Sequence, residues 1–143
     1  MMNINFGESL SGIILERNIN SKDLAKQLGV SHESVNNWKS NRTGIELSQL
    51  IKLCKYFNCS LDYLVGITER DTKPSKYTLE NFGIHVRKIM KSRNITTYKL
   101  QKETRYSGKY FNVWDRGSDP KLSTLLELAN YFNCSLDELV GLE

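Results

Sequence analysis

The strongest constraint on this chain is a segment that it contains twice. YFNCSLD occurs at residues 56–62 and again at 131–137, and each copy is followed one residue later by Leu-Val-Gly. A self-match of this length does not arise by chance in 143 residues, and an internal repeat indicates one structural unit built twice. The offset between the copies is 75 residues, which is too long for a solenoid repeat and suits a small globular domain.

The repeat extends towards the N-terminus of each copy. Phe6-Gly7 aligns with Phe82-Gly83 and Trp38 with Trp114, after which the first copy carries one extra residue. The shared positions are mostly apolar and three or four residues apart, as expected for helices that face a core. The residues just before Trp38 differ almost completely from those just before Trp114. We therefore expect one scaffold that presents two different surfaces.

The apolar spacing predicts an all-α protein with five short helices in each copy. In the first copy, Ser21 and Ser31 are expected to cap the second and third helices, and Gly29 is expected to end the second. In the second copy, Asp119-Pro120 is expected to cap and open the fourth helix. The third helices are expected at about 32–40 and 108–116.

The organisation of the chain follows from the repeat. The first domain is expected at 1–68 and the second at 82–143. Residues 69–81 between them are charged, contain Pro74 and show no apolar periodicity, so they are expected to form a linker.

Charge is unevenly distributed between and within the copies. The first copy has a net charge of +1 and the second +3. Residues 85–116 carry nine basic residues against Glu103 and Asp115, whereas 119–143 carry one basic and five acidic residues. Such polarisation is what a face that binds a polyanion produces, although a solvated helix face can also look like this.

Several classes of protein are disfavoured. No apolar run approaches 18 residues and no signal peptide is evident, so a cytoplasmic protein without a membrane partner is expected. Cys54, Cys59 and Cys134 form no metal-binding pattern and are interpreted as small buried residues. No nucleophile–base pair, glycine-rich phosphate loop or metal ligand set is recognisable, so we expect no enzyme, no cofactor, no metal and no small-molecule ligand.

Residues 21–38 carry the functional signal. A short helix ending at Gly29, a three-residue turn and a helix starting at Ser31 form a helix-turn-helix, whose second helix can enter the major groove. Together with LSQLIKLCKYFNCSLDYLVG, this segment resembles the Cro/repressor-like (XRE) helix-turn-helix family of bacterial and phage transcription regulators. The resemblance covers both copies and implies two lambda-repressor-like five-helix domains that bind double-stranded DNA.

The resemblance also implies roles for residues in and around the third helices. Glu33 could accept from a cytosine amine, and Asn37 could pair with adenine. Gly108 replaces His32 and Val113 replaces Asn37 in the second copy, so base reading is expected to be less specific there. The implied base-reading residues are His32, Glu33, Ser34, Asn37, Lys109, Tyr110 and Asn112. The implied phosphate contacts are Ser21, Lys22, Lys39, Ser40, Asn41, Arg42, Tyr98, Lys99, Arg105, Arg116 and Lys121.

The second copy departs from the family pattern at its turn, where Arg105-Tyr106 replaces Gly29-Val30. A positive φ at a residue other than glycine costs on the order of 1 kcal/mol, so either the turn is altered or it is strained. Tyr106, Tyr110 and Phe111 could pack into a core or an interface instead of contacting DNA.

The sequence therefore predicts a DNA-binding transcriptional regulator, a bacterial or phage-type repressor. It would bind as a homodimer or as a pseudo-dimer made of the two domains of one chain. One alternative is a protein-interaction module that antagonises another regulator, in which case binding to duplex DNA would lack a steep salt dependence. Another is an antitoxin or phage-immunity component with the same fold.

Overall fold

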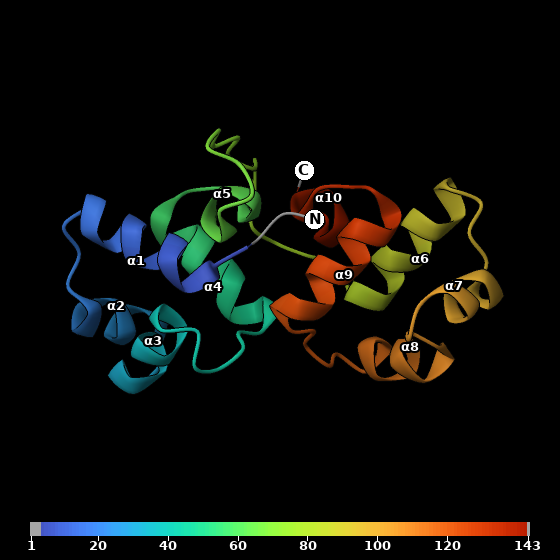
Figure 1. Cartoon of the computed structure of the whole chain (residues 1–143), viewed down its shortest axis with the longest axis horizontal. Helices are drawn as coiled ribbons and strands as arrows, with labels where there is room; N and C mark the ends of the chain where they lie inside the picture. The colour runs from blue at the N-terminus through green and yellow to red at the C-terminus, as the bar shows by residue number, and fades with distance from the viewer. Residues whose placement is uncertain (1–3, 143) are drawn as a thin grey trace. The chain divides into compact units, whose positions relative to one another are not determined.

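The fold consists of two similar helical units. The computed structural model describes residues 4–142, which contain ten helices and no strand. The boundary between the two compact units lies between Tyr77 and Thr78 (Figure 1). The predicted all-α fold with five helices in each copy is thus confirmed. Within the described residues, no helix is long and apolar enough to cross a membrane.

The helices of the two units correspond one to one. The first unit contains α1 (Phe6–Glu16), α2 (Ser21–Leu28), α3 (His32–Lys39), α4 (Leu47–Phe57) and α5 (Leu61–Val65). The second unit contains α6 (Phe82–Ser92), α7 (Thr97–Glu103), α8 (Gly108–Asp115), α9 (Leu122–Phe132) and α10 (Leu136–Val140). The third helix of each unit, α3 or α8, ends within one residue of its predicted position.

Each unit has its own apolar core, made from repeat-equivalent positions. In the first unit the fully buried side chains include those of Leu10, Leu24, Val35, Leu50 and Leu64. Their counterparts in the second unit are Val86, Leu100, Phe111, Leu125 and Leu139, all of which are also buried. The shared apolar register seen in the sequence is therefore the register of two separate cores.

Local capping chemistry sets the bounds of α2 and α3. Ser31 caps α3 through a 3.0 Å hydrogen bond from a backbone N–H of the first turn. Gly29 ends α2 with φ of +72°, and both observations match the prediction. The prediction that Ser21 caps α2 is wrong, because Asn20 accepts the backbone hydrogen bonds instead. Both residue types cap well, and the asparagine stands one position earlier.

The prediction for the start of the fourth helix in the second unit is also wrong. Asp119-Pro120 does not open α9, because Lys121 is its N-cap residue and Leu122 its first helical residue. Pro120 is buried and stands where the buried Ile45 stands in the first unit. The proline therefore serves as an apolar core residue ahead of the helix.

The repeated arginine after the first helix has the same contact in both units. The Arg17 guanidinium donates a hydrogen bond to the carbonyl of Phe57, the last residue of α4. Arg93 donates through Nε to the carbonyl of Phe132, the last residue of α9, at 2.9 Å. A cation at the C-terminal end of a helix satisfies carbonyls that lack an intrahelical partner. The arginine thus fastens the first helix of each unit to the fourth.

Part of the segment at 69–81 packs against the first unit. The Tyr77 hydroxyl donates to the carbonyl of Cys59 at 3.0 Å. Asp71 accepts a hydrogen bond of 2.9 Å from a backbone N–H next to that carbonyl. Residues up to Tyr77 accordingly group with the first unit rather than standing free.

Candidate nucleic-acid interface

In the first unit, α2 and α3 form the helix-turn-helix that the sequence predicted. The backbone N–H of Val30, just past the turn glycine, donates to a carbonyl of α2 at 3.0 Å. Helix α3 buries Val35 and Trp38, so its opposite face is turned outward. The predicted base-reading residues of this unit lie on the accessible part of α3, with Glu33 exposed and the others half-buried: His32, Ser34 and Asn37.

Two predicted phosphate contacts are brought together where α2 begins and α3 ends. The Lys39 ammonium donates to the hydroxyl of Ser21 at 3.1 Å, although the two residues are 18 positions apart. The exposed Lys22 follows Ser21 directly. An ammonium group and a hydroxyl beside the N-terminus of a helix are suited to hold a phosphate, because the helix end also carries partial positive charge.

The segment after α3 has a structural role that sequence reasoning missed. Asn41 adopts φ of +57°, and its side-chain oxygen Oδ1 accepts from the backbone N–H of Gly7 at 2.8 Å. Its side-chain nitrogen Nδ2 donates to the side-chain oxygen Oδ1 of Asn5 at 2.6 Å. The Ser40 hydroxyl donates back to a carbonyl of α3 at 3.0 Å. Asn41 thus fixes this segment to the start of α1, while Arg42 is exposed.

The turn of the second helix-turn-helix is altered rather than strained. Helix α7 ends at Glu103, and Thr104 is extended, with φ of −134°. The Thr104 hydroxyl donates to the carbonyl of Leu100 at 2.7 Å and accepts from the backbone N–H of Tyr106 at 3.0 Å. Arg105 is not among the residues with positive φ. A threonine side chain therefore ends this helix where the first unit uses a glycine.

Arg105 is exposed, but its guanidinium is paired with a carboxylate of its own unit. Its guanidinium lies 2.7 Å from a carboxylate oxygen of Glu127 on α9. The hydroxyl of Tyr106 donates to the other oxygen of that carboxylate at 3.1 Å. A hydrogen bond with Tyr106 and the nearby negative charge raise the pKa of Arg105. This predicted phosphate contact is thus partly neutralised within the unit.

Helix α8 differs from α3 in the chemistry of its outer face. It buries Phe111 and Trp114 and exposes the predicted reading residues Lys109 and Asn112. Tyr110, also predicted to read bases, is 36% exposed. The outer face of α8 therefore combines a cation, an amide and an aromatic ring.

Four of the nine basic residues in 85–116 are paired with carboxylates. Arg87 makes a two-pronged contact with Asp115, at 2.6 and 2.8 Å, which lowers the pKa of that carboxyl group. The other three paired residues are Lys88, Arg93 and Arg105. Among the described residues, the remaining five form no ion pair: Lys91, Lys99, Lys102, Lys109 and Arg116.

The unpaired cations are concentrated on α7, on α8 and just after it. Lys99, Lys102, Lys109 and Arg116 all come from these elements and are exposed. Two further predicted phosphate contacts, Tyr98 and Lys121, are also exposed. The Lys102 ammonium lies 5.9 Å from the centre of the Tyr98 ring. The second helix-turn-helix, with Arg116 directly after it, therefore carries four of the five unpaired cations of residues 85–116.

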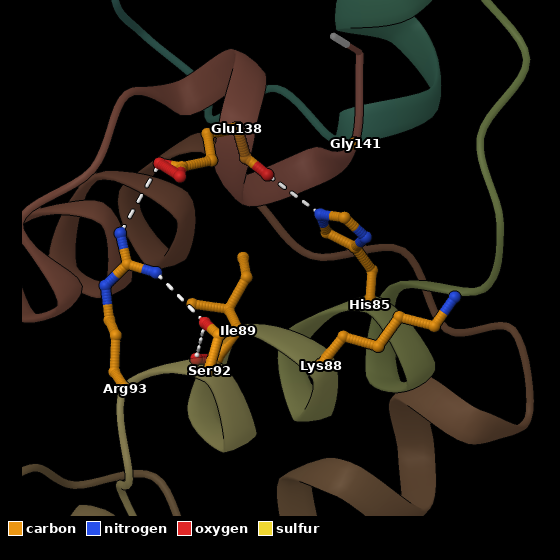
Figure 2. A pocket seen from close by; sticks show the side chains of 7 residues that line it. All are labelled: His85, Lys88, Ile89, Ser92, Arg93, Glu138 and Gly141. Atoms are coloured by element: carbon orange, nitrogen blue, oxygen red, sulfur yellow. Dashed lines mark hydrogen bonds and ion pairs between the residues drawn. The ribbon is translucent and has the colours of Figure 1, made fainter.

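A groove of about 240 Å³ lies elsewhere in the second unit, between α6 and α10 (Figure 2). His85 has Nδ1 2.9 Å from a carboxylate oxygen of Glu80 and Nε2 2.8 Å from the carbonyl of Glu138. Hydrogen bonds from Lys88 and His85 lower the pKa of Glu80. The polar groups that line the groove thus bind one another and fasten α6 to α10.

A match to a known domain family agrees with this geometry. The Cro/C1-type HTH DNA-binding domain matches the chain twice, over residues 9–69 and 85–143. A crystal structure of a transcriptional regulator from Listeria innocua resembles the chain with a TM-score of 0.44 and 22% identity, over 71% of this chain and 87% of that one. No curated protein sequence shows significant similarity. Because the two domain matches span most of its length, the chain belongs to the Cro/C1-type helix-turn-helix DNA-binding family, with one such domain in each unit.

Proposed function

We propose that the protein is a sequence-specific transcriptional repressor that engages one asymmetric DNA site with both of its domains. The observation that carries the proposal is that one chain holds two Cro/C1-type domains whose third helices expose different residues. Two different reading helices favour a site with two different halves. A tethered second domain can raise avidity by about 10²–10⁴ without any new contact.

The two domains divide the work of binding. The second supplies more of the affinity, because within the described part of the chain four exposed cations without an ion pair lie on α7, on α8 or just after it, against three on the corresponding elements of the first unit. In addition, the exposed Lys121 stands where the first unit has the exposed Glu46. Contacts between cations and phosphates are largely independent of sequence. The first supplies more of the discrimination, because Glu33 and Asn37 are suited to base edges and Glu33 repels phosphate.

A substitution on α3 tests sequence-specific binding. Asn37→Ala should weaken binding to the preferred duplex by about 1–3 kcal/mol and leave binding to random duplex nearly intact. Gln27→Ala is the control, because Gln27 is an exposed amide side chain on α2 that is not among the predicted base-reading residues. The measurement is fluorescence anisotropy on both duplexes, after footprinting upstream of the protein's own gene has located the site. Equal losses on both duplexes would argue against a base contact.

One observation favours a second candidate function. Tyr110 and Val113 expose 36% and 39% of their surface on α8, and exposed apolar side chains on a helix can bind another protein. The protein would then antagonise a regulator instead of binding an operator. A salt titration separates the two functions, because affinity for duplex DNA falls steeply with salt only if phosphates are neutralised.

A further inference from the structure

Helix α8 carries an apolar patch in the middle of its outer face. Tyr110 and Val113 are 36% and 39% exposed, and residues three positions apart are neighbours on a helix surface. Lys109, Asn112 and Arg116 are exposed on the same helix or directly after it, so they surround the patch with polar groups. We call Tyr110 and Val113 the α8 apolar patch.

The patch is held in place before any ligand arrives. The ring of Tyr110 lies 4.9 Å from that of Tyr106 and 5.9 Å from that of Trp114, centre to centre. Both of these neighbours are buried. The side chain of Val113 is β-branched and therefore has little rotamer freedom in a helix. A surface with so little freedom loses little entropy on binding.

The first unit has polar residues at the same two positions. Ser34 and Asn37 stand there on α3, and both can exchange hydrogen bonds with base edges. Val113 can make no hydrogen bond through its side chain, so the corresponding point on α8 needs an apolar partner. In the major groove of DNA, the apolar group that bases present is the C5-methyl of thymine.

We propose that the α8 apolar patch reads thymine C5-methyl groups in the half-site bound by the second unit. The methyl group packs against the side chain of Val113 and the ring of Tyr110, while Lys109 and Arg116 contact phosphates on either side. This inference rests on the proposed DNA-binding function. It adds that the second unit selects its bases by apolar contact, whereas the first selects by hydrogen bonds.

Deoxyuridine substitution tests the inference directly. It keeps the base pair and the O4 acceptor of thymine and removes only the C5-methyl. The preferred duplex is first selected from a random pool with the full chain, and each thymine is then replaced in turn. Replacing one or two thymines in the half-site of the second unit should weaken binding roughly fourfold each, as expected for the loss of one buried methyl group.

Protein variants then show whether Val113 is the residue that senses the methyl group. Val113→Ala should bind the thymine duplex several-fold more weakly and lose most of the sensitivity to deoxyuridine. Asn37→Ala, the matched variant in the first unit, should keep that sensitivity in full. Because Val113 is exposed, its replacement should leave the fold unchanged, which circular dichroism can verify.

The outcomes separate this inference from the proposed function. If the chain binds its duplex in a salt-dependent way but no deoxyuridine weakens binding, methyl reading is refuted and DNA binding stands. Unchanged DNA affinity of Val113→Ala would equally refute it and point to a protein partner for the patch. If the chain binds no duplex at all, both proposals fail.

Discussion

Replacing Gly7 by alanine should destabilise the first unit, because α1 lies very close to the end of α3 at this residue. A Cβ atom on Gly7 would lie less than 3.0 Å from the carbonyl oxygen of Lys39 and 2.8 Å from Nδ2 of Asn41. The carbonyl belongs to the backbone and cannot rotate away. The new methyl group would therefore force the two helices to shift and would strain the hydrogen bond of 2.8 Å between the Gly7 N–H and Asn41.

The magnitude follows from two opposing effects. Overpacking of this kind costs typically about 1–3 kcal/mol, whereas alanine in place of glycine favours a helix by roughly 0.5–1 kcal/mol. We therefore expect Gly7→Ala to lower the free energy of unfolding by about 1–2 kcal/mol. Gly12 lies on the same helix, and a Cβ there would meet nothing within 4 Å. Gly12→Ala should accordingly stabilise the unit by roughly 0.5–1 kcal/mol.

Urea unfolding of the full chain can measure both effects. Each unit contains one of the two tryptophans, so a Trp114→Phe background leaves Trp38 as the fluorescent reporter of the first unit. This separation matters, because a two-domain protein does not unfold in one two-state transition. The reasoning about the close approach would be refuted if Gly7→Ala were as stable as Gly12→Ala. Since residues 39–41 include predicted phosphate contacts, Gly7→Ala should also weaken DNA binding.

Three further expectations concern the second unit. Gly108→Ala should stabilise it by about 0.4–1 kcal/mol in urea unfolding, because a Cβ there meets nothing within 4 Å and φ is not left-handed. Burial and the hydrogen bond to Glu103 raise the pKa of Tyr131 to about 12. The stability that this raised pKa contributes should be complete below about pH 10, the pKa of an unfolded tyrosine, and should be lost as the pH rises towards 12. Tyr131→Phe should abolish this loss when unfolding is measured as a function of pH. In salt titrations, Lys109→Ala should flatten the slope of log affinity against log salt by about 1. Arg105→Ala should flatten that slope by less, because a carboxylate on α9 already pairs with the Arg105 guanidinium. Equal changes in slope for the two variants would contradict this difference between Lys109 and Arg105.

Local signals made much of the fold predictable from sequence. The turn at Gly29 and the cap at Ser31 depend on residues only a few positions apart, so the pattern was sufficient. The cap of α2 is not predictable in the same way, because Ser21 and Asn20 beside it are equally good caps. The structure places the cap at the asparagine, a choice that capping preference alone cannot make.

The candidate site was predictable in outline but not in its internal contacts. The family resemblance located the third helices, and the burial of Val35 and Trp38 explains which face of α3 is outward. The contact of Lys39 with Ser21, the anchoring of Asn41 and the pairing of Arg105 join residues at least 18 positions apart. Such pairs depend on the tertiary fold, and no short-range pattern in the sequence announces them.

The different anchors of α3 and α8 limit how these helices can be exchanged by protein engineers. Lys39, the last residue of α3, contacts Ser21, whereas its repeat equivalent Asp115 contacts Arg87 on α6. Ser11 occupies the position of Arg87 in the first unit. A chimera that carried α8 into the first unit would leave the Asp115 carboxylate without its guanidinium. A graft of new DNA specificity between the two halves must therefore transfer the matching residue of the first helix as well.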